Sequence, residues 1–202
     1  MQHDEDLNHT TNIYEYGGRW EDLQRDDGQW YVEDFTLAQL KMLRRFQRYQ
    51  DHRSAMLNDR FEMITMNELI ENVIMLEQDA PRKINSGTKV GLYIELKNYD
   101  EKVKTRGIDE AEMLFELLQH YNLSTIADSK DTIPIIIQSF DKNALTKMAT
   151  LTDLPLVKLC NDQHINDWDE ISGYSHGVGV PSDWIMNNLS TETEGDYSQF
   201  ID

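Results

Sequence analysis

A histidine at the start of the chain and a glutamate at the end of an apolar run have the clearest potential for chemistry. His3 and Asp4 open the string HDEDLNHTT, and Glu95 and Lys97 close the run VGLYIELK. A histidine can donate a proton near neutral pH, and a carboxylate at the end of a buried strand can bind a cation. These residue types together suggest metal-assisted hydrolysis.

Each of these residues also has a structural interpretation. The chain has six histidines, so His3 could be an ordinary surface imidazole. Glu95 and Lys97 point to the same side of a strand and could simply form an ion pair. Gln138, at the end of the run IPIIIQSF, could donate to a phosphate oxygen or could anchor a loop. Spacing alone leaves these alternatives open.

The net charge argues against several kinds of partner. The chain carries 37 acidic and 19 basic residues, which gives a formal net charge of -18. Such a field repels nucleic acid and anionic lipid, so a phosphate-bearing substrate would need a bound divalent cation or a few well-placed basic side chains. No apolar run reaches the roughly 18 residues of a membrane span. We therefore expect neither a nucleic-acid partner nor a membrane span.

Short apolar runs alternate with helical stretches in the second half of the chain. The runs near residues 90–95, 133–138, 156–159 and 177–180 predict buried strands of a parallel sheet. The string EAEMLFELLQH predicts a helix over residues 110–120. This alternation indicates the α/β class, either as a doubly wound sheet or as a barrel.

Some polar residues near the strand ends are better explained by structure than by chemistry. Ser139 and Asp141 fit a turn and a helix N-cap, since no histidine is tied to them by spacing. His176 precedes the last apolar run, which would place it at the opposite end of the sheet from Glu95.

Residues 12–60 are polar, rich in charge and spotted with aromatics, which predicts an inserted segment. Thr36 and Gln39 form a capping box that should begin a helix there. A basic run follows and is interpreted as the solvated C-terminal face of that helix, with an anion site as the alternative. The run consists of Arg44, Arg45 and Arg48.

Several segments, taken in order, resemble the glycerophosphodiester phosphodiesterase family, which has a TIM (β/α)8 barrel fold. HDEDLNHTT is similar to the family's HD-x-x-L-x-x-TT segment, VGLYIELK to its E-x-K strand, and IIIQSFDKNAL to a strand-to-helix turn. The strings EDFTLAQLKML, MITMNELIENV, LPLVKL and GVGVPSDWI also match in order. The resemblance implies a partial family domain over residues 1–188, with 12–60 like the insertion of a bacterial periplasmic-like subgroup and 189–202 a polar tail.

The resemblance also implies a reaction and a site. The reaction is metal-dependent hydrolysis of a glycerophosphodiester to glycerol 3-phosphate and an alcohol. His3 would protonate the leaving alcohol, Glu95 would bind calcium or magnesium, and Lys97 and Gln138 would contact the substrate. The alternative is a degenerate module that keeps the fold for binding or assembly without turnover. The subgroup favours a secreted, periplasmic or vacuolar location.

Departures from the family pattern matter as much as the matches. The HRG strand and the E-x-D pair that normally precede the HD motif have no counterpart here, and neither does the final W-T-x-N strand. We therefore expect a partial barrel with about strands 4 to 7 and without strands 1 to 3 and 8. Such a chain should lack most of the activity on its own and should self-associate through exposed sheet edges.

Overall fold

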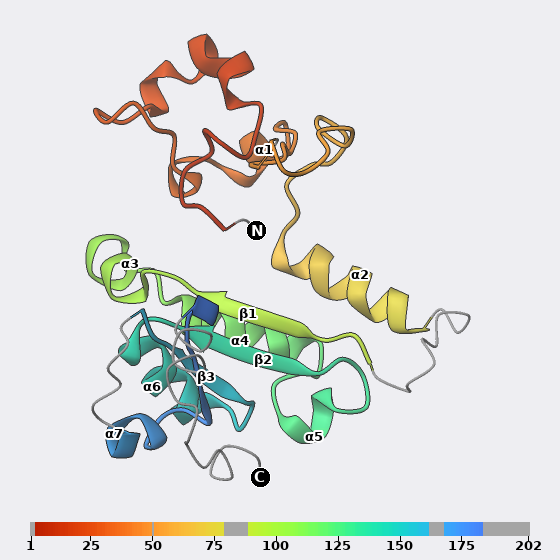
Figure 1. Cartoon of the computed structure of the whole chain (residues 1–202), viewed down its shortest axis with the longest axis vertical. Coiled ribbons are helices and arrows are strands. Elements are labelled where there is room, and N and C mark those ends of the chain that lie inside the picture. Colours follow the sequence, from red (N-terminus) through yellow and green to blue (C-terminus); the bar gives the residue numbers. More distant parts are fainter. Residues whose placement is uncertain (1–2, 50, 79–88, 162–167, 184–202) are drawn as a thin grey trace. The chain divides into compact units, whose positions relative to one another are not determined.

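A computed structural model describes residues 3–49, 51–78, 89–161 and 168–183 of the chain. The chain divides into two compact units, an N-terminal unit that ends at Asn72 and a sheet unit that begins at Val73 (Figure 1). The predicted polar tail lies outside the described residues.

The N-terminal unit consists of short elements around an apolar cluster. Three 3-10 helices and one short α-helix lie along it, followed by the beginning of α2: η1 (Ile13–Arg19), η2 (Glu21–Leu23), η3 (Val32–Asp34), α1 (Leu37–Leu40) and α2 (Met66–Gln78). Trp30 is buried and donates from its ring nitrogen to the carbonyl of Trp20 over 2.9 Å. Because the elements are short, this cluster supplies most of the packing that stabilises the unit. Its buried members are Leu7, Ile13, Trp20, Trp30, Phe35, Leu43 and Met63.

The predicted capping box is present, but the helix that it begins is short. Thr36 Oγ1 accepts from the backbone N–H of Gln39, and the Gln39 side chain accepts from the backbone N–H of Thr36. The helix nevertheless ends at Leu40, after a single turn.

The basic run does not form the C-terminal face of that helix, so this prediction is wrong. Arg44 forms an antiparallel bridge with Glu62, and Arg45 forms one with Thr11. Backbone pairing with distant segments therefore replaces the helix that local propensity favours. Arg48, also outside the helix, forms an ion pair with Asp4.

In its described residues, the sheet unit contains four parallel strands in the order β1 (Leu92–Leu96), β2 (Ile135–Ser139), β3 (Leu156–Leu159) and β4 (Gly177–Gly179). The predicted α/β class and the four predicted strands are confirmed to within a few residues. Helices connect the strands: α3 (Tyr99–Arg106), α4 (Glu110–His120), α5 (Ile126–Ser129), α6 (Lys142–Leu151) and α7 (Trp168–Ser172). The helix predicted over residues 110–120 matches α4.

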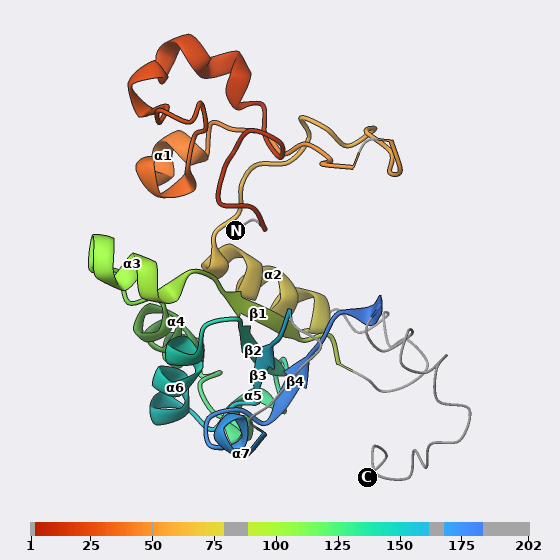
Figure 2. The same cartoon turned by 60° about the vertical axis from the view of Figure 1, so that its left-hand side comes forward.

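The two faces of this sheet differ. Figure 2 shows α4 and α6 together on one side of the strands, and the alternate residues Ile94, Ile137 and Leu156 are buried. On the other face, Tyr93 is 54% and Ile136 37% exposed, because strand side chains alternate between faces. A four-stranded parallel sheet with helices on one face is consistent with part of a (β/α)8 barrel.

The first strand begins at Leu92 rather than at residue 90. A Cβ atom on Gly91 would lie 2.4 Å from the carbonyl oxygen of Pro134, so only glycine allows the two backbone segments to approach each other here.

None of the helices in the described ranges is both long and apolar enough to cross a bilayer.

Ser139 joins the ends of β1 and β2, and its removal should be costly. Its buried hydroxyl donates to the carbonyl of Leu96 over 2.7 Å and accepts from the N–H of Asp141 over 2.9 Å. We expect Ser139→Ala to lower the free energy of unfolding by about 1–3 kcal/mol, because two buried hydrogen bonds are lost. Denaturant unfolding measures this change, and exposed Ser172 provides the control. A Ser139→Ala effect no larger than that of Ser172→Ala would contradict it.

The exposed apolar side chains and the edges of the sheet should promote association between chains. In the described part, β1 and β4 each have one strand neighbour, and unpaired edges beside exposed apolar side chains favour pairing. We expect sedimentation velocity to show concentration-dependent association that Ile136→Lys weakens. Ile126→Lys, on α5, is the matched control. A sharp monomeric unfolding transition that is independent of protein concentration would count against this prediction.

Candidate functional site

The carboxyl ends of the parallel strands bring three of the predicted site residues together. Glu95 is paired in register with Gln138, and Gln138 with Val157. Residues opposite each other in a parallel ladder point to the same face, so Glu95 and Gln138 share the face that carries Tyr93. Lys97 follows β1 by one residue and has the same parity as Glu95. The predicted rim is therefore formed by neighbouring strands.

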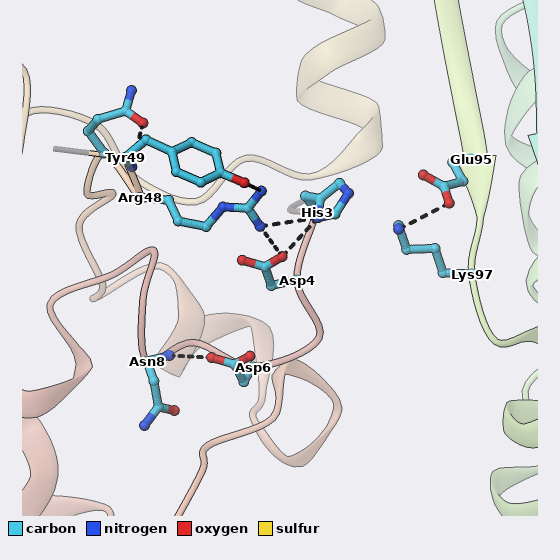
Figure 3. Close-up of polar contacts among 9 residues, drawn as sticks. His3, Asp4, Asp6, Asn8, Arg48, Tyr49, Glu95 and Lys97 are labelled. Carbon is cyan, nitrogen blue, oxygen red and sulfur yellow. Dashed lines mark hydrogen bonds and ion pairs between the residues drawn. The ribbon is translucent and has the colours of Figure 1, made fainter. Parts of the chain in front are cut away.

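Glu95 and Lys97 form an ion pair. Lys97 Nζ lies 3.0 Å from Glu95 Oε1, and the side chains are 28% and 17% exposed (Figure 3). Although this distance is short, Glu95 Oε1 is buried and accepts no hydrogen bond of good geometry from any described residue. A buried carboxylate oxygen without hydrogen bonds is costly and can accept a further positive ligand.

A complete metal site is not found in the described part of the chain. No group of three or more histidine, cysteine, aspartate or glutamate side chains lies close enough there to hold an ion. Glu95 fits a divalent cation by its chemistry and by the state of Oε1, but it offers a single carboxylate. Calcium and magnesium use several oxygen ligands, so Glu95 alone is an incomplete set.

His3 lies in the N-terminal unit, where its shortest polar contact is with the next residue. Its Nδ1 lies 2.8 Å from Asp4 Oδ1, and the imidazole is 68% exposed. Asp4 also accepts a hydrogen bond from Arg48, as Figure 3 shows. Burial raises the pKa of Asp4, but the hydrogen bonds from His3 and Arg48 outweigh it and hold that pKa below its ordinary value. Asp4 is therefore an anion beside the imidazole.

The sequence did not predict that Asp4 and Arg48 contact His3. Asp4 follows His3 directly, so adjacency was an available signal, although neighbouring side chains need not touch. Arg48 is distant in sequence, and its partner depends on the fold of the N-terminal unit. No local pattern distinguishes it from Arg44 or Arg45.

The residues given a structural interpretation have structural contacts. Ser139 is a turn residue, as predicted. His176 pairs with Leu156 just before β4. Its backbone N–H donates to the Leu156 carbonyl, and its ring nitrogen Nδ1 accepts from the backbone N–H of Leu156. Asp141 occupies the N-cap position of α6, but its side chain makes no capping hydrogen bond; it accepts instead from the N–H of Asp100 over 3.4 Å.

Comparison with known proteins identifies the family of the chain. The model of the glycerophosphoryl diester phosphodiesterase family matches residues 1–190. The chain belongs to this family. It is 32% identical over 189 residues to glycerophosphodiester phosphodiesterase GDPD6 of Arabidopsis thaliana, and the match covers 81% of this chain and 48% of that protein. The chain thus spans about half the length of this curated relative.

Membership of the glycerophosphoryl diester phosphodiesterase family bears on both units. The matched residues include the HDEDLNHTT segment and the whole sheet. His3 and the rim of Glu95, Lys97 and Gln138 therefore lie within the family match.

Proposed function

We propose that this chain contributes to the metal-dependent hydrolysis of glycerophosphodiesters to glycerol 3-phosphate and an alcohol. Membership of the family supports this proposal. The observation that carries it is Glu95 Oε1, a buried carboxylate oxygen at the carboxyl end of a parallel strand with Lys97 as its ionic partner and no hydrogen bond from a described residue. In parallel α/β folds this edge is where reacting groups gather.

Glu95 would be one ligand of calcium or magnesium. When bound, the cation would offset the negative charge of the phosphodiester, which the chain as a whole repels. Lys97 would then turn from Glu95 toward a phosphate oxygen, and the Gln138 amide would donate to the substrate beside it. His3, when protonated, would donate its proton to the oxygen of the departing alcohol as the phosphorus–oxygen bond breaks. A water molecule would form the new phosphorus–oxygen bond, and the proton that it releases would restore protonated His3 through solvent.

A second candidate is a binding or assembly module of the same fold without turnover. It is favoured by the absence of a three-ligand cluster among residues 3–49, 51–78, 89–161 and 168–183. The two functions differ in the hydrolysis test below.

Cation binding should be local to Glu95. We expect calcium or magnesium to shift the backbone amide resonances at the ends of β1 and β2 in NMR titrations, with weak affinity because a single carboxylate is available. Glu95→Gln should abolish these shifts, while Glu116→Gln, on the exposed face of α4, should not. Equal shifts in the wild type and Glu95→Gln would contradict the assignment of Glu95.

Hydrolysis should depend on His3 and on the cation. With glycerophosphocholine as the probe, we expect slow release of glycerol 3-phosphate that chelation abolishes. His3→Ala should lower the rate by about 10²-fold or more, because a positioned general acid typically contributes this much. His9→Ala, in the same segment and exposed, is the control.

A rate unchanged in His3→Ala would exclude His3 as the acid. Complete absence of hydrolysis, with cation-dependent binding of the phosphodiester retained, would favour the binding module.

A further inference from the structure

The imidazole of His3 meets a carboxylate and a guanidinium at the same ring nitrogen. Nδ1 lies 2.8 Å from Asp4 Oδ1 and 3.4 Å from Nη1 of Arg48. The same Arg48 nitrogen donates to Asp4, so the three side chains form a triangle (Figure 3).

The two contacts of Nδ1 require opposite protonation states. Beside ionised Asp4, which only accepts, Nδ1 must carry a hydrogen; beside Arg48, which only donates, it must not. The carboxylate contact is shorter by 0.6 Å, and a charge-assisted hydrogen bond is the stronger of the two. Nδ1 is therefore the protonated nitrogen, and Arg48 directs its hydrogen bond to Asp4.

Backbone hydrogen bonds fix both sides of this contact. On one side, Leu7 donates to Trp30, and Val32 donates to Glu5, over 2.8 and 3.1 Å, which holds the segment that carries Asp4.

The segment that carries Arg48 is held in the same way. Phe46 donates to the carbonyl of Thr10 over 2.8 Å, and the N–H of Gln47 donates to the side chain of Asn58 over 2.8 Å. Arg48 also lies over the ring of Tyr49, with 4.5 Å from its Cζ to the ring centroid. Its guanidinium is thus held by Tyr49 as well as by Asp4.

We propose that Asp4 and Arg48 are positioning residues that hold neutral His3 as the Nδ1–H tautomer, so that Nε2 is the nitrogen that exchanges protons with the substrate. Arg48 belongs to the segment predicted to be inserted, which gives that segment a role at the catalytic histidine. This inference rests on the proposed function of His3. Asp4 and Arg48 act on His3 and do not themselves touch the substrate.

The tautomer can be measured without enzymatic activity. Long-range ¹H–¹⁵N correlation spectra of the full chain, recorded at alkaline pH where an imidazole is neutral, show which ring nitrogen carries the hydrogen. We expect Nδ1–H in the wild type and a shift to Nε2–H, the form that predominates in unstructured peptides, in Asp4→Asn. Arg48→Met should shift the population in the same direction, and Arg48→Lys should restore part of it.

Arg60→Met, an exposed arginine of the same segment, is the matched control and should leave the tautomer unchanged. An unchanged tryptophan near-ultraviolet spectrum for each variant would show that the core around Trp30 remains folded. If Asp4→Asn or Arg48→Met loses that spectrum, the tautomer of the wild type still tests the proposal. An Nε2–H wild type, or an Arg48→Met population equal to that of the control, would overturn the proposal.

The test separates this inference from the proposed function. Loss of hydrolysis in His3→Ala with an Nε2–H wild type would keep the function and remove the positioning role. An Nδ1–H tautomer in the wild type, together with hydrolysis that is unaffected by His3→Ala, would keep the positioning of His3 and remove its proposed function as the acid.

Discussion

The register between β1 and β2 is the constraint on which the sheet site depends. Glu95 faces Gln138 because Leu92 pairs with Ile135 and the ladder proceeds without a bulge to Leu96 and Ser139. A slip of one residue would send Glu95 toward the helices and Ile94 toward the open face. Burial of the alternate isoleucines under α4 and α6 opposes such a slip, and the Ser139 hydroxyl ties the two strand ends together. The packing that stabilises the fold therefore also presents the carboxylate.

The N-terminal unit is stabilised differently from the sheet unit. It has little regular secondary structure, so an apolar cluster and a few backbone bridges determine where its chain segments meet. Those bridges place residues 44–48 beside residues 4–11, and this placement allows Arg48 to form its ion pair with Asp4. The position of Asp4 and Arg48 beside the histidine thus depends on backbone hydrogen bonds at Trp30 and Phe46.

The difference between the units explains which features the sequence could predict. In the sheet unit, apolar runs and capping residues are local signals, and each strand was found within a few residues of its predicted place. The placement of Glu95, Lys97 and Gln138 at or just after strand ends was predictable because strand ends are visible in the sequence. In the N-terminal unit, the capping box at Thr36 was equally visible, but the length of the helix was not, because distant backbone partners take over after Leu40. The partner of Arg48 depends on the same long-range pairing, so no local pattern could reveal it.

Electrostatics constrains how the proposed phosphodiester substrate could bind. A chain with a net charge of -18 repels a phosphodiester at long range, so attraction has to be created locally and at short distance. At the sheet rim, Lys97 forms an ion pair with Glu95, and in the proposed function a cation would take the place of Lys97 at that carboxylate. In the N-terminal unit, Arg48 forms an ion pair with Asp4, and we propose that this charge orients His3. The rim could therefore gain positive charge only when a cation binds, and this would make substrate binding conditional on the metal.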